Sequence, residues 1–174
     1  MSQSVPAVAD LMRAAKTSAV HLELHDSYGI AREMDALKTW RATGKRNVDP
    51  ASDHWRSWVE LIGATTGRGV AVQRARIVSE PVSEYIRYEY AGTSVVVGAG
   101  EEVRWLPRRL ASALTLPGND FWLFDSRIVR FNHFTGDGAS AEPEYTEDAA
   151  VAELCTSAFR AVWERATPHA DYAV

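Results

Sequence analysis

Hydrophobic and polar residues alternate most clearly in residues 118–134, GNDFWLFDSRIVRFNHF, beyond the middle of the chain. Because successive side chains of a strand point to opposite faces, Phe121 and Leu123 share one face and Trp122 lies on the other. Turn-forming residues bound the stretch, with Pro-Gly-Asn at its start and Thr-Gly-Asp-Gly after it. The pattern predicts a β-hairpin with a tight turn at residues 125–127, which forms the structural centre of the fold.

Alternation also predicts further strands on the N-terminal side of this hairpin. They cover residues 19–25, 70–78, 84–90, 94–97 and 103–106. In the first of these strands the apolar side chains face inward, and His21, Glu23 and His25 form a polar side that faces solvent.

Apolar residues three or four positions apart predict helices, the last of which ends before Pro168. We expect an N-terminal helix or flexible tail, 1–17, followed by a single α+β (mixed α/β) domain, 18–174. Its sheet is expected to be largely antiparallel, with about five to six strands and a two-helix insertion after the first strand. The expected parts of the domain are a helical hairpin at 30–66, the sheet at 69–134 and a C-terminal helix at 146–166.

The composition narrows the class of protein. The chain has 174 residues, 46% of them hydrophobic and 24% charged, which is typical of a globular domain. A net charge of −4 disfavours direct nucleic-acid binding, which usually requires a basic domain. The chain contains neither a run of about 20 apolar residues for a membrane helix nor a convincing secretory signal. The sequence therefore predicts a cytoplasmic protein without a membrane segment.

Arginine and aromatic residues fall on the polar positions of several predicted strands. If these strands align, their guanidinium groups form a pocket for a small anionic ligand, because arginine forks suit carboxylates and phosphates. Ion pairs with Glu84, Glu89 and Glu102 are the alternative explanation of the same pattern. The predicted ligand-binding residues are Arg74, Arg76, Tyr85, Arg87, Trp122, Arg130 and His133.

Other motifs give little support to catalysis. The spacing of His21, Glu23 and His25 on one strand, with His133 as a remote third imidazole, suits a metal, but an exposed polar strand face is the favoured explanation, because alternation already requires polar residues there. No phosphate-binding loop and no Gly-x-Ser-x-Gly motif occur, and Cys155 lies on the apolar stripe of a predicted helix. We therefore predict no catalytic residues, no metal site and no cofactor.

Three segments, RARIVSEPVSEYIRYEY, GEEVRWLPRR and GNDFWLFDSRIVRFNHFTGDG, resemble an uncharacterised family of small actinobacterial proteins. This family is classed as a domain of unknown function, and the resemblance extends over residues 18–172, with DFWLFD (residues 120–125) as its most specific part. Its genes commonly lie beside helix-turn-helix regulators, so the resemblance implies a role in a regulatory pair. The order of elements is also similar to ligand-sensing domains related to the phospholipase D fold. The duplicated His-x-Lys signature of active phospholipase D enzymes is absent, which favours binding over hydrolysis.

Two functional hypotheses follow. The first is a non-enzymatic regulatory module that binds a helix-turn-helix regulator and a small anionic ligand. Whether this module is a monomer or a homodimer is left open by the sequence. The alternative is a toxin-like nuclease or other phosphodiester hydrolase that uses His133, Asp120, Glu84 and the arginines. Direct DNA binding is a third hypothesis, which the net charge and the lack of an obvious recognition helix disfavour.

Overall fold

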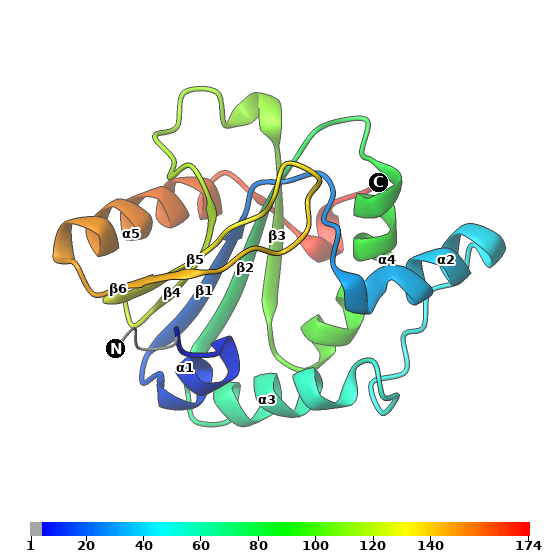
Figure 1. Ribbon diagram of the computed structural model, residues 1–174, viewed down its shortest axis with the longest axis horizontal. Coiled ribbons are helices and arrows are strands. Elements are labelled where there is room, and N and C mark those ends of the chain that lie inside the picture. Colours follow the sequence, from blue (N-terminus) through cyan, green and yellow to red (C-terminus); the bar gives the residue numbers. More distant parts are fainter. Residues whose placement is uncertain (1–4) are drawn as a thin grey trace.

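A single mixed β-sheet forms the centre of the molecule (Figure 1). The computed structural model describes residues 5–174, without the side chain of Arg32. The strands in this part of the chain are β1 (Ser18–Glu23), β2 (Ala71–Val78), β3 (Glu102–Pro107), β4 (Asp120–Phe124), β5 (Ile128–Asn132), β6 (Glu144–Thr146) and β7 (Thr167–Pro168). Their order across the sheet is β6-β5-β4-β1-β2-β3-β7.

Most neighbouring strands are antiparallel. The pairs β1–β2 and β2–β3 are parallel, and the other four pairs are antiparallel. The predicted α+β fold with one largely antiparallel sheet is therefore confirmed. The described residues contain seven strands, against the five to six expected. Five of them lie at predicted strands, β6 lies partly in a segment predicted as a loop, and β7 lies at the proline predicted to end the last helix.

Helices cover both faces of the sheet (Figure 1). The helices are α1 (Val8–Ala14), α2 (Met34–Thr43), α3 (Arg56–Thr66), α4 (Glu84–Gly98) and α5 (Ala149–Trp163), with 3₁₀ turns η1 (Ala31–Glu33), η2 (Arg108–Leu110) and η3 (His169–Asp171). Helix α5 packs alone on one face, against Phe121, Leu123 and Val129. The other face, with Trp105, Trp122 and Phe124, packs against α1, α3 and α4. None of these helices is long and apolar enough to cross a membrane.

The predicted central hairpin is present as β4 and β5. Its turn residues Asp125 and Ser126 both have φ of 52°, the left-handed conformation that a two-residue turn matching the strand twist requires. The Asp125 carboxylate accepts hydrogen bonds from the backbone N–H groups of Lys16, Thr17 and Ser18, at 2.7 to 3.0 Å. The turn is therefore also the anchor for the segment that leads into β1.

The region from Glu84 to Gly98 corrects the sequence analysis, which predicted strands at 84–90 and 94–97. These residues form helix α4. Its N-terminus is capped by the Ser83 hydroxyl, which accepts a hydrogen bond from the Ile86 N–H. Because β2 and β3 are parallel neighbours, the chain must cross over between them, and a helix is the usual crossover.

The polar side of β1 is a second correction. His21 and Glu23 were expected to face solvent, but they are only 7% and 9% exposed. Helices α1, α3 and α4 cover this face, so both sides of β1 are buried. Apolar alternation identifies the inward side of a strand correctly, but it does not reveal a polar side that is also covered.

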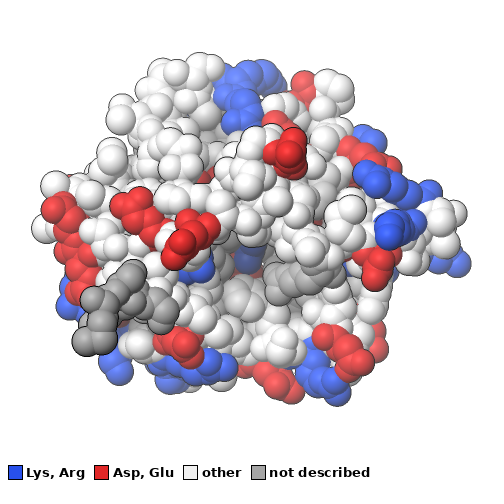
Figure 2. All heavy atoms as spheres, viewed as in Figure 1, with Lys and Arg blue, Asp and Glu red and all other residues white. Residues whose placement is uncertain are grey.

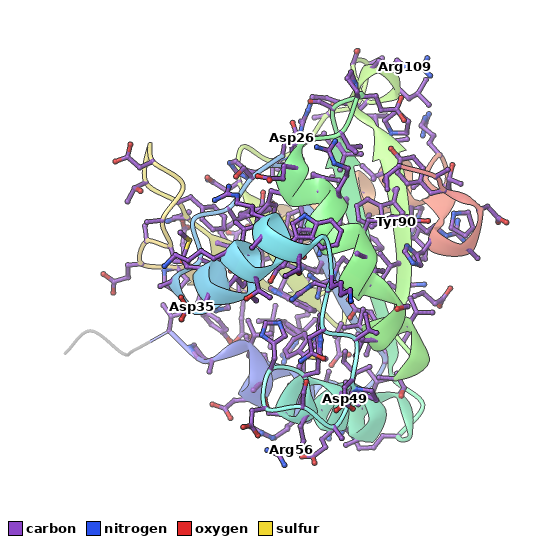
Figure 3. The ribbon with its side chains drawn as sticks, turned by 90° about the vertical axis from the view of Figure 1, so that its right-hand side faces the viewer. Asp26, Asp35, Asp49, Arg56, Tyr90 and Arg109 are labelled. Carbon is purple, nitrogen blue, oxygen red and sulfur yellow. The ribbon has the colours of Figure 1, made fainter. Side chains whose placement is uncertain are left out.

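The C-terminal segment docks on α4 and β3. The hydroxyl of Tyr90, on α4, donates to the backbone oxygen of Tyr172 at 2.7 Å (Figure 3). The Tyr172 ring stacks on Trp105 of β3 with ring centroids 5.6 Å apart. These contacts hold the C-terminal segment against α4 and β3.

Candidate functional site

A cavity of about 710 Å³ lies between the sheet and helices α1, α3 and α4. Figure 2 shows it as a hollow in the face of the molecule, with basic and acidic side chains inside. Its volume lies within the range of about 300–1,000 Å³ that is usual for small-molecule sites. We call this cavity the central pocket.

A buried chain of ion pairs forms the floor of the central pocket. Arg74 contacts Glu101 at 2.6 Å and Glu23 at 3.1 Å, while Arg76 contacts Glu23 at 2.9 Å and Glu89 at 2.7 Å. Both guanidinium groups are therefore already engaged by two carboxylates each. An anion could bind them only by displacing a buried carboxylate, which is costly in a region of low dielectric constant.

Aromatic rings line the walls of the pocket. His21 stacks on Trp122 with centroids 4.2 Å apart, and Trp58 of α3 meets the edge of Trp122 at 6.1 Å. Burial, together with nearby arginines, lowers the pKa of His21 well below its usual value. The imidazole is thus uncharged at neutral pH and lies nearly parallel to the Trp122 indole, at 15°, whereas the Trp58 indole stands at 71° to Trp122.

A second polar cluster lies at the end of β1, around the buried carboxylate of Asp120. This group accepts hydrogen bonds from the Tyr28 hydroxyl, from the Leu24 N–H at 3.0 Å and from His25 Nδ1 at 2.9 Å. Burial raises the pKa of Asp120 and of Tyr28. His25 borders a second cavity of about 590 Å³, which shares Tyr28 and Phe134 with the central pocket.

Four of the predicted ligand-binding residues border the central pocket: Arg74, Arg76, Tyr85 and Trp122. Tyr85 reaches it from α4, not from a strand, and its hydroxyl donates to Glu33 at 2.7 Å. The alternation of β2 and β4 had placed the other three on polar or aromatic positions of one face, and the parallel and antiparallel pairing with β1 brings them together.

The other three predicted residues lie elsewhere. Arg87 is on the exposed side of α4 and donates to the Val82 oxygen. Arg130 does not line the pocket but lies beside it: it donates to the Pro6 backbone oxygen and to Oδ1 of Asn132, which borders the pocket. His133 lies 3.7 Å from Glu144 of β6. The prediction for Arg87 assumed a strand at 84–90, and the helix places this side chain on the opposite side from the sheet.

The residues proposed for hydrolysis do not meet. Asp120 borders the central pocket, Glu84 pairs with Arg41 at 2.9 Å on the surface, and His133 is at β6. Across residues 5–174, no three histidine, cysteine, aspartate or glutamate side chains are grouped to hold a metal ion. His21 points into the central pocket, whereas His25 turns toward Asp120.

Sequence reasoning missed several pocket residues, including Arg46, Trp55, Trp58 and Tyr28. Trp55 and Trp58 lie within the predicted helical hairpin at 30–66, and their helical spacing gives no reason to separate a pocket wall from the core. Arg46 lies in the connection between α2 and α3, where no periodicity indicates a direction. Gly92 of α4 makes room for Arg46 and Trp55, but it gives no signal in the sequence, where it falls between two predicted strands.

Comparison with solved structures shows a shared fold. Nuc, a phospholipase D family member from Salmonella typhimurium, is similar with a TM-score of 0.52 and 14% identity, over 92% of this chain and 87% of that one. NucT from Helicobacter pylori has a TM-score of 0.53 and 12% identity, over the same shares. TrmBL2, an archaeal chromatin protein, has a TM-score of 0.48 and 15% identity over 91% of this chain and 48% of that one.

At these identities the first two structures show the fold and nothing further. A search of the curated proteins finds no match to the sequence. The family model described as Domain of unknown function (DUF6879) matches residues 6–174, so the chain belongs to that family.

Proposed function

We propose that the protein is a non-enzymatic cytoplasmic regulatory module that binds a small molecule in the central pocket. The observation that supports this most directly is the pocket itself, a cavity of about 710 Å³ between the sheet and three helices. Its aromatic wall, in which Trp58 meets the edge of the buried Trp122, offers apolar surface to a ring.

The polar groups of the pocket support binding in preference to catalysis. The arginines of the floor are fixed by Glu23, Glu89 and Glu101, so they provide a rigid polar surface. The thiol of Cys155 is on the α5 face of the sheet, away from the pocket, and burial raises its pKa to about 12. A thiol in that state is a core group and not a nucleophile.

A helix-turn-helix regulator is the partner we propose for this module. The net charge of −4 disfavours direct DNA binding by this protein, so a DNA-binding partner would make that contact. The resemblance in sequence also implies a regulatory pair. Ligand occupancy would then change the affinity between the two proteins, which requires that the ligand binds one of the two states more tightly.

The pocket is tested with N-phenyl-1-naphthylamine, an uncharged flat aromatic probe whose fluorescence rises in apolar sites. We expect one bound probe per chain and a loss of at least tenfold in affinity in Trp58→Ala. Trp163→Ala is the matched control, because Trp163 stacks on Phe159 at the α5 face. Equal weakening by both substitutions, or no binding to the unmodified protein, would refute a ligand site in this pocket.

The partner is tested separately, by pull-down and calorimetry with the regulator encoded beside the gene. We expect a complex of defined stoichiometry, and sedimentation of the isolated protein shows whether a homodimer is the species that binds. If the purified proteins do not associate with or without a ligand, the regulatory pair is excluded.

One observation favours a second candidate function, phosphodiester hydrolysis. His25 and Asp120 form a hydrogen-bonded pair beside the second cavity, and the side chain of His25 is 44% exposed. An imidazole oriented by a carboxylate is the usual arrangement of a general base. Hydrolysis of bis(p-nitrophenyl) phosphate that is lost in His25→Ala and kept in His133→Ala would establish this function. No hydrolysis by the unmodified protein, with or without divalent metals, would reject it.

A further inference from the structure

We propose that Arg46 recognises the ligand of the central pocket by a single negatively charged group. The inference rests on the proposed function. It assigns the anion-binding role, predicted for Arg74 and Arg76, to a residue outside the sheet. The corresponding ligand class is a flat aromatic acid that carries one carboxylate, sulfonate or phosphate monoanion.

The position of Arg46 depends on the connection between α2 and α3, which runs past α4 to Asp49 (Figure 3). The Trp55 indole N–H donates to the Asn47 oxygen at 2.8 Å and closes this connection into a loop. The Arg46 guanidinium carbon lies 3.8 Å from the ring centroid of Tyr88 and 5.0 Å from that of Trp55. The guanidinium is thus held at the pocket edge by two aromatic rings.

A glycine on α4 makes room for this arrangement. A Cβ atom at Gly92 would lie 3.0 Å from both Arg46 Nε and Trp55 Cζ2. Such a separation is shorter than ordinary van der Waals contact. The bare backbone of Gly92 therefore lets Arg46 and Trp55 lie flat against the helix.

Arg46 differs from the other arginines that line the pocket because its charge is not paired with a carboxylate of the described residues. Arg74 and Arg76 each contact two carboxylates, and Arg13 pairs with Asp10 at 3.0 Å. Among the residues that the structure describes, Arg46 contacts no carboxylate, and its side-chain hydrogen bond is with His54 Nε2 at 3.3 Å. Its Nε and Nη1 atoms are buried without a hydrogen-bond partner in that part of the chain.

Arg46 is half-buried, and two nitrogen atoms of its cation are removed from water without a counterion. This lowers stability, and contact with aromatic faces offsets the loss only in part. An anion that enters the central pocket meets this charge without displacing a carboxylate. Elsewhere the pocket presents Glu23, Glu89 and Asp120, which repel further negative charge. One anionic group beside Arg46, with the ring against the tryptophans, is therefore the arrangement that the charges favour.

The test compares two dyes that differ by one charged group. They are 8-anilinonaphthalene-1-sulfonate and its uncharged counterpart N-phenyl-1-naphthylamine. We expect Arg46→Gln to weaken sulfonate binding at least tenfold, because a hydrogen-bonded charge pair is lost, and to change binding of the uncharged dye less than about twofold. Arg13→Gln is the matched control, since Arg13 borders the pocket but is already paired on the surface.

A second measurement uses the unmodified protein and does not depend on how a variant folds. The ¹⁵N–¹H resonance of Arg46 Nε should shift clearly further on adding the sulfonate dye than on adding the uncharged dye, since only the sulfonate can accept a hydrogen bond from it. If both dyes bind and Arg46→Gln weakens neither, or the resonance does not respond, Arg46 is not the anion-binding residue although the pocket is real. If neither dye binds to the unmodified protein, the proposed function fails instead.

Discussion

The side chain of Asp125 connects two segments that are distant in sequence. It occupies the left-handed turn of the hairpin, and its carboxylate accepts hydrogen bonds from the backbone N–H groups of Lys16, Thr17 and Ser18. Burial opposes ionisation, but these hydrogen bonds outweigh it and lower the pKa of Asp125 below its usual value. Sequence analysis placed the turn correctly, since local residue types determine it, but the partner segment lies more than 100 positions away.

We predict that Asp125→Ala lowers the free energy of unfolding by about 2–4 kcal/mol, because charge-assisted hydrogen bonds and a favourable left-handed residue are both lost. Asp125→Asn keeps the turn conformation and should cost less. Urea unfolding at pH 7 measures both effects. A cost below about 0.5 kcal/mol for the alanine variant would contradict the anchoring role.

The pH dependence of stability provides an independent check on Asp125. Its pKa is lower in the folded than in the unfolded protein, where it is about 3.9. The carboxylate therefore stabilises the fold above that value, and the contribution is lost as the pH falls through the folded pKa. We expect the difference in unfolding free energy between the unmodified protein and Asp125→Asn to be constant from pH 7 to about pH 5 and to shrink below about pH 4. A difference that is unchanged down to pH 2 would contradict this account.

At the scale of elements, helix α4 shows where short patterns mislead. Within EYIRYEY the apolar and charged residues alternate, and Ser94–Val97 is rich in β-branched residues, so each window taken separately favours a strand. Over the whole segment, the buried positions Tyr85, Tyr88, Gly92 and Val96 recur every three or four residues, as in a helix. The parallel pairing of β2 with β3 settles the choice, and no local pattern contains that information.

Two glycines of α4 separate the effect of helix propensity from that of packing. Alanine is favoured over glycine in a helix by about 1 kcal/mol. A Cβ atom at Gly98 meets no atom within 4 Å, so we predict that Gly98→Ala stabilises the protein by up to about 1 kcal/mol. Gly92→Ala should lose this gain through contact with Arg46 and Trp55, and it should weaken binding of the sulfonate dye. Thermal unfolding and dye titration measure the two effects, and equal stabilisation by both substitutions would contradict the tight packing at Gly92.

The whole molecule determines what the pocket can contain. Alternation placed Arg74 and Arg76 on one face of β2, but the carboxylates that neutralise them come from β1, from α4 and from the residue before β3. Of these carboxylates, sequence reasoning named only Glu89, in the alternative explanation by ion pairs, and the pocket hypothesis therefore overestimated the positive charge of the site. Strand order, which depends on packing across the whole chain, decides which charges meet.

A ligand in the central pocket would contact elements that are distant in sequence but lie on one face of the sheet. Binding should therefore stabilise that face more than the face covered by α5. At a free dye concentration of 100 times Kd, binding adds about 2.7 kcal/mol to the free energy of unfolding. For a chain of this size, that corresponds to a rise of roughly 5–10 °C in Tm.

Amide hydrogen exchange should slow most in the elements that line the pocket, which are α1, α3, α4 and the connection that carries Arg46. Helix α5, on the opposite face, should keep the exchange rate of its locally opening amides. Amide hydrogen exchange with and without the sulfonate dye measures this pattern, and Arg46→Gln at the same dye concentration is the control. Protection confined to α5 would place the dye on the other side of the sheet and contradict binding in the central pocket.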